Sequence, residues 1–71
     1  MARLATTVNG RRILEIEPMG HYTAPWYIIE VHGPLYEGKP LPCWVTLDNL
    51  EAAIAEAERR GPLPDGPEIS N

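Results

Sequence analysis

Three side chains of the sequence have the chemistry to bind a metal or to act as nucleophile and base: His21, His32 and Cys43. They are scattered along the chain, without the close spacing of paired ligands that structural zinc sites typically show. A single cysteine between Pro42 and Trp44 is typical of a small buried hydrophobic residue rather than of an activated thiol. No glycine-rich phosphate loop or metalloprotease motif occurs. We therefore predict no catalytic residue, no metal and no cofactor.

The length of the chain also argues against an enzyme. With 71 residues it forms one small domain, and folding at this size removes only about 60 % of the unfolded chain's surface from water. A substrate cleft of roughly 300 Å3 or more would leave little core around it. The single cysteine excludes an internal disulfide and fits a reducing compartment. Since no signal-peptide core and no run of about 18 apolar residues occurs, we expect a cytoplasmic protein without a membrane segment.

The distribution of charge points to a basic partner. The net charge is −4, and residues 1–36 hold three acids and three arginines, so the whole excess lies in residues 37–71. An acidic surface disfavours direct contact with nucleic acids and anionic membranes. It favours a larger protein with a basic surface.

Four acids at the C-terminal helix are the candidate partner-binding residues: Asp48, Glu51, Glu56 and Glu58. Glu56 has Arg60 four residues later, in the favourable order for a helical ion pair, whereas the other three have no basic residue at i+3 or i+4. Asp48, Glu51 and Glu58 would form an acidic edge beside the apolar stripe. The alternative is an ordinary solvated helix face whose first acids favour the helix dipole.

Trp26 and Trp44 are candidate apolar anchors, because tryptophan is enriched among the residues that dominate interfaces. The alternative is packing within the protein, since tryptophan is highly buried on average. Together with Arg11 and Arg12 they could also stack and hold nucleic-acid bases, although the positively charged groove of such binders is missing. The two arginines are more simply interpreted as solubility residues that flank a turn.

These residues are positioned by a predicted order of four strands and one helix. Asn9-Gly10 between two β-prone runs favours a two-residue hairpin turn. Such a turn would set Val8 opposite Arg11, Thr6 opposite Ile13 and Ala5 opposite Leu14. We expect strands at 3–8, 11–17, 26–32 and 43–47, with loops at 17–25 and, because of its three prolines, at 33–42. The helix follows, capped by Asp48 with Glu51, or instead by Thr46, and ended by Gly61-Pro62.

The predicted fold is α+β: a four-stranded antiparallel sheet, formed by the N-terminal hairpin and two further strands, with one C-terminal helix packed on one face. Leu50, Ala53, Ile54 and Ala57 form the apolar stripe that should contact the sheet. Residues 1–61 form the domain, and the proline-rich residues 62–71 are expected to be a flexible tail. One helix covers one face, so Trp26, Ile28 and Trp44 are left on the other for loops or a partner to cover.

In size, acidity and architecture, the chain with its opening "VNGRRILEIE" and closing "LDNLEAAIAEAERR" resembles small phage-encoded inhibitors, among them anti-CRISPR proteins. The resemblance implies activity by occlusion of a nucleic-acid-handling complex in an infected host cell. We therefore expect a non-enzymatic inhibitor, monomeric or homodimeric, that acts by steric block or charge mimicry. The alternatives are a small nucleic-acid-binding module that uses Arg11, Arg12 and the Trp face, and a dimerising structural subunit.

Overall fold

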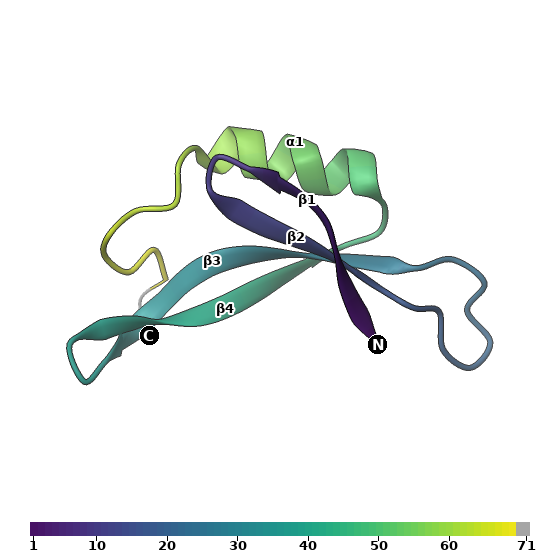
Figure 1. Cartoon of the computed structure of the whole chain (residues 1–71), viewed down its shortest axis with the longest axis horizontal. Coiled ribbons are helices and arrows are strands. Elements are labelled where there is room, and N and C mark those ends of the chain that lie inside the picture. Colours follow the sequence, from purple (N-terminus) through teal and green to yellow (C-terminus); the bar gives the residue numbers. More distant parts are fainter. Residues whose placement is uncertain (70–71) are drawn as a thin grey trace.

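The structure, a computed structural model, describes residues 1–69 and forms one antiparallel sheet followed by one helix (Figure 1). Its elements are β1 (Ala2–Val8), β2 (Arg11–Ile16), β3 (Trp26–Tyr36), β4 (Lys39–Leu47) and α1 (Leu50–Arg60). The strand order β1-β2-β3-β4 follows the chain. α1 lies along one face of the sheet (Figure 1). The predicted α+β architecture of four strands and a C-terminal helix is confirmed.

The first hairpin forms at the predicted turn. Asn9 and Gly10 have φ angles of 55° and 76°, as a type I′ turn requires at both central positions. Val8 therefore pairs with Arg11. The twist of such a turn matches that of the two strands it joins, which is why an Asn-Gly pair could be recognised from the sequence alone.

Further from the turn, β1 contains a bulge that the sequence did not indicate. Thr6 pairs with Ile13 as predicted, but the register then shifts, and Leu4 rather than Ala5 lies opposite Leu14. The predicted pairing of Ala5 with Leu14 is therefore wrong. The extra residue of a bulge moves Leu4 to the same face as Leu14, where two large apolar side chains make a better cross-strand pair than alanine and leucine.

The second hairpin is longer than predicted. We expected residues 33–42 to be a loop, but β3 continues to Tyr36 and β4 begins at Lys39. A two-residue turn joins them, with φ angles of 51° at Glu37 and 82° at Gly38. Pro40 and Pro42 lie on the edge strand β4, where a missing N–H on the open side removes no ladder hydrogen bond. Pro34 lies on β3 beyond its pairing with β2 and at the register shift between His32 and Leu35, a place where proline is tolerated.

Helix α1 begins one residue later than predicted. Its N-cap is Asn49, whose side chain accepts a hydrogen bond from the Ala52 N–H at 2.8 Å, so the predictions of Asp48 or Thr46 as the cap are wrong. β4 continues through Leu47, and Asn49 is then the residue with the extended backbone that a cap needs. Both Asp and Asn are good caps, so residue type alone could not choose between neighbours.

The hydrophobic core lies between α1 and the sheet. Ile13, Ile29, Ala53 and Ala57 are fully buried and form one cluster. Around it pack partly buried side chains from the strands and the helix: Val8, Tyr27, Leu47, Leu50 and Ile54. The predicted helix stripe thus contacts the sheet as expected. The opposite sheet face, called the outer face below, packs against no helix among residues 1–69.

The proline-rich segment after α1 returns to the sheet (Figure 1). The Leu63 N–H donates a hydrogen bond to the Asn9 carbonyl at 3.0 Å, and the Glu68 N–H donates to the His32 carbonyl at 2.8 Å. Residues 62–69, which we expected to be part of a flexible tail, are therefore in contact with the β1–β2 turn and with β3. Residues 70 and 71 of that predicted tail lie outside the described residues.

The position of the N-cap can be tested by stability. Asn49→Ala removes the capping oxygen, and we expect it to lower the free energy of unfolding by about 1 kcal/mol. Asp48→Ala should cost about 0.5 kcal/mol or less, since it removes only a favourable charge near the helix N-terminus. Urea denaturation of both variants measures the difference. A larger loss of stability for Asp48→Ala than for Asn49→Ala would contradict the assignment of Asn49 as the N-cap.

Candidate functional site

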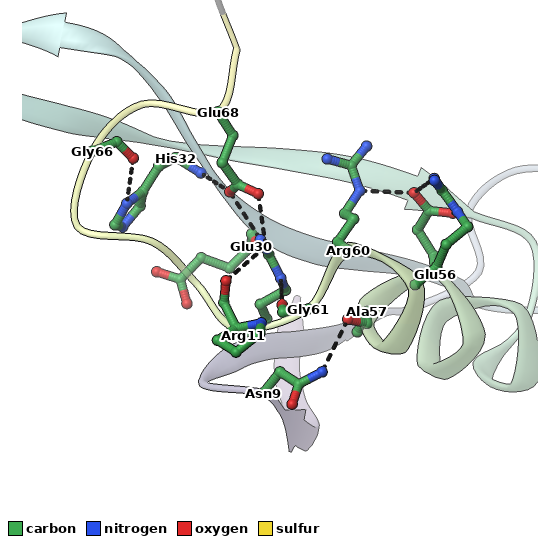
Figure 2. Close-up of polar contacts among 12 residues, drawn as sticks. Asn9, Arg11, Glu30, His32, Glu56, Ala57, Arg60, Gly61, Gly66 and Glu68 are labelled. Carbon is green, nitrogen blue, oxygen red and sulfur yellow. Dashed lines mark hydrogen bonds and ion pairs between the residues drawn. The ribbon is translucent and has the colours of Figure 1, made fainter.

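A buried arginine on β2 joins β3, the end of α1 and the segment after it (Figure 2). Arg11 has no exposed surface. Its Nε donates to the Gly61 carbonyl at 2.8 Å, and its two terminal nitrogens donate to the carbonyls of Glu30 and Pro62 and to both carboxylate oxygens of Glu68. These five hydrogen bonds match the five N–H donors of a guanidinium group. The buried charge is thus paired and fully hydrogen-bonded.

Glu68 is the partner that neutralises this arginine. Its oxygens lie 2.9 and 2.6 Å from the terminal nitrogens of Arg11, and one of them also accepts from the His32 N–H at 2.8 Å. Hydrogen bonding to Arg11 lowers the pKa of Glu68, and the His32 N–H lowers it further, against the opposing effect of burial. The interpretation of Arg11 as a solubility residue is therefore wrong. The partner is 57 positions away, so no local pattern pointed to it.

We expect Arg11→Ala to be strongly destabilising. Removing one member of a buried ion pair leaves the other charge uncompensated and typically costs about 3–5 kcal/mol, a large part of the roughly 4–10 kcal/mol available to a domain of this size. The matched control is Arg3→Ala, since Arg3 pairs with Glu15 at 3.4 Å on the surface and should change stability by about 1 kcal/mol or less. Denaturant titration measures both. If both variants lost the same free energy of unfolding, the buried Arg11–Glu68 pair would contribute no more to stability than a surface pair.

The same pair predicts acid sensitivity. Because the pKa of Glu68 is lower in the folded chain than its ordinary value of 4.5, the ionised form stabilises the fold. This contribution is fully present above pH 4.5 and is lost as pH falls through the folded pKa. We expect the decrease in unfolding free energy between pH 7 and pH 3 to be smaller in Glu68→Gln than in wild type. Glu58→Gln, which removes an exposed acid, should show the same decrease as wild type. If Glu58→Gln also reduced the decrease, the acid sensitivity could not be assigned to Glu68.

Ion pairs account for all the arginines. Among residues 1–69 the pairs are Arg3–Glu15, Arg11–Glu68, Arg12–Glu30, Arg59–Glu56 and Arg60–Glu56, and the Met1 amino group pairs with Glu17. Their five arginines and five glutamates cancel in formal charge. The net charge of −4 therefore lies on the remaining charged side chains, which are Glu37, Asp48, Glu51, Glu58 and Asp65 against Lys39. All five of these acids are exposed.

Three of these five acids lie on α1 or at its entry. Asp48, Glu51 and Glu58 are exposed and take part in none of the ion pairs among residues 1–69. Glu56, the fourth predicted residue, is instead held by Arg59 and by Arg60 at 2.7 Å, and these hydrogen bonds lower the pKa of its carboxyl group. The acidic edge therefore consists of Asp48, Glu51 and Glu58.

Trp44 lies apart from the acidic edge, on the outer face. Its side chain is 36 % exposed, and the Arg12 guanidinium lies 5.3 Å from the ring centroid. Arg12 also pairs with Glu30 at 2.9 Å, which raises the pKa of Arg12 and lowers that of Glu30. With Arg11 buried and Arg12 paired, neither arginine of the hairpin is a free cation. Glu30 lies opposite Trp44 in the sheet, so the surroundings of this tryptophan are charged. Leu4 on β1 is 59 % exposed.

Trp26 and Asp48 line one pocket. Tyr27 pairs with Leu47 across the antiparallel strands β3 and β4. Trp26 precedes Tyr27 and Asp48 follows Leu47, so these two residues are neighbours at the end of the sheet. The pocket has a volume of about 350 Å3 and is lined by residues 21–26 together with Asp48. The rings of Tyr22 and Trp26 meet edge to face, with centroids 5.9 Å apart. The structure thus brings together two predicted site residues and adds Tyr22, a loop residue that was not among the predicted partner-binding residues.

The three residues considered first for metal or covalent chemistry lie in separate surroundings. His21 lines the pocket, the Nδ1 of His32 is 3.3 Å from the Gly66 carbonyl, and the Cys43 sulfur packs over Gly33, where an added Cβ would overlap it. No group of three His, Cys, Asp or Glu side chains among residues 1–69 has a metal-binding arrangement. In the same residues, no helix has the length and apolar character to cross a bilayer.

Similarity to known proteins adds no guidance on these surfaces. In comparisons with known proteins, no protein family, no curated protein and no solved structure matches the chain. The acidic edge, the pocket beside it and the outer face are therefore the features from which a function can be inferred.

Proposed function

We propose that this chain is a non-enzymatic binding protein that docks its acidic edge onto a basic surface of a larger, nucleic-acid-handling protein. The observation that carries the proposal is the separation of charge. Each arginine is paired with a glutamate of the same chain, one pair buried and the others at the surface, whereas Asp48, Glu51 and Glu58 are exposed outside those pairs. A surface built only for solubility would mix both signs, whereas a one-sign edge steers a partner of opposite charge.

The edge has features that suit protein docking. It runs along a helix whose other side is fixed in the core through Ala53 and Ala57, so binding needs no large rearrangement of the backbone. Asp48 also lines the pocket that contains Trp26, and this neighbourhood supports a role for Trp26 as an aromatic anchor. Charged groups at the rim of an interface speed encounter, whereas buried aromatic contacts slow release.

Occlusion is the proposed consequence of such docking. A basic surface that normally binds phosphate groups would be covered by carboxylates that compete for the same arginines and lysines. No chemistry by the chain itself is required. We place the interaction in a reducing cytoplasm, because the one cysteine of the sequence, Cys43, is a free thiol.

The test uses two variants with the same change in charge. Glu51→Lys/Glu58→Lys reverses the edge, and Glu37→Lys/Asp65→Lys reverses two exposed acids elsewhere. Tagged wild type and both variants are used to capture proteins from nuclease-treated host lysate, and the affinity of the identified partner is then measured at several salt concentrations. We expect the edge variant to bind at least about tenfold more weakly and the control to bind as wild type, because rim charges act locally.

The outcomes separate this function from the alternatives. Equal binding by both variants would remove the acidic edge from the interface. Capture that depends on nucleic acid would favour the nucleic-acid-binding module. If wild type and both variants captured only further copies of this protein, the dimerising subunit would be favoured. The outer face, with the exposed side chains of Leu4 and Trp44, is the apolar surface available for such a dimer.

A further inference from the structure

The pocket between the 21–26 loop and Asp48 has the chemistry of a cation site. Asp48 is the only one of its lining residues that carries a formal charge when histidine is neutral. The aromatic rings of Tyr22 and Trp26 line the same space and contact each other edge to face. Aromatic faces attract cations through their quadrupole, and a carboxylate adds direct charge pairing. Both features favour the same kind of ligand.

The nearby helix does not reverse this preference. α1 begins next to Asp48, and a helix N-terminus carries the equivalent of about half a positive charge. However, one of its free N–H groups is already used, since the Ala52 N–H donates to the Asn49 side chain. Asp48 carries a full negative charge in the lining itself, against the roughly half positive charge of the helix end. The charge of the lining therefore favours a cation over an anion.

Size and exposure favour one side chain over a large ligand. The volume of about 350 Å3 is near the lower end of the roughly 300–1,000 Å3 typical of small-molecule sites. Tyr22 is 64 % exposed, so the pocket is open enough for a group that projects from another protein. An arginine side chain uses both features, because its planar guanidinium stacks on aromatic rings and pairs with a carboxylate in a forked geometry.

We propose that this pocket binds an arginine side chain of the basic partner, with Asp48 pairing the guanidinium group and the Trp26 and Tyr22 rings packing against it. The proposal rests on the proposed function, since it names the group by which that partner is anchored. In this proposal the Tyr22 ring favours a planar guanidinium over a compact ammonium group, because a flat cation can stack on an aromatic ring. The acidic edge then provides attraction over a longer range, and the pocket provides a defined contact at its end.

The test uses two short blocked peptides, one with a single arginine among glycines and one with citrulline in its place, which keeps the shape and removes the charge. Binding is followed by NMR through the two indole N–H signals. Trp26 reports on the pocket, and Trp44 on the outer face is an internal control. We expect the arginine peptide to shift only the Trp26 signal and the citrulline peptide to shift neither. Asp48→Asn should weaken arginine binding about fivefold, and Glu51→Gln less than twofold.

Three results would overturn the proposal. Equal shifts with arginine and citrulline would indicate an uncharged apolar groove, and equal shifts of Trp26 and Trp44 would indicate non-specific contact. Tighter binding of tetramethylammonium than of the arginine peptide would indicate a site for a small quaternary amine. Failure here is distinguishable from failure of the proposed function: if Asp48→Asn and Tyr22→Ala keep full affinity for a captured partner that the Glu51→Lys/Glu58→Lys variant loses, only the pocket proposal fails.

Discussion

The arrangement of this protein depends on the burial of one charge. Arg11 has no exposed surface, and a guanidinium removed from water requires both a counter-ion and acceptors for its five N–H groups. The acceptors come from β3, from the end of α1 and from the segment after it, through Glu30, Gly61, Pro62 and Glu68. The requirements of one side chain therefore fix four parts of the chain relative to one another.

This constraint complements a thin hydrophobic core. α1 has one apolar stripe, and the fully buried cluster that it forms with the sheet contains two isoleucines and two alanines. The apolar stripe ends with the helix at Arg60. Beyond that point, residues 62–69 and the hydrogen bonds of Arg11 connect the chain to the sheet. Small domains have little apolar area to bury, and an ordered polar cluster extends the packed region where apolar side chains are lacking.

The same pairing determines which charges are available outside. Each arginine is held by a glutamate, from Arg3 with Glu15 to Arg60 with Glu56. The charges outside these pairs are almost all negative, and three of the five acids among them lie along one edge of α1. Internal neutralisation thus concentrates the net charge into a directional surface, and the pocket with Trp26 lies at the end of that edge.

The sequence by itself determined the features that depend on neighbours in the chain. The Asn9-Gly10 turn, the apolar stripe of α1, the Gly61 stop and the α+β order of elements are local, because backbone geometry and side-chain periodicity act over a few residues. Tertiary structure alone decided the features that depend on distant partners or on register. The Arg11–Glu68 pair joins residues far apart in sequence, the bulge at Ala5 depends on packing across strands, and the cap at Asn49 depends on where β4 ends.

For the candidate site, the acids of the helix could be predicted from residue type. The pairing of Glu56 with arginines and the meeting of Tyr22, Trp26 and Asp48 in one pocket were decided by the tertiary structure. The pocket in particular needs the fold, because only the fold brings the 21–26 loop next to the start of α1.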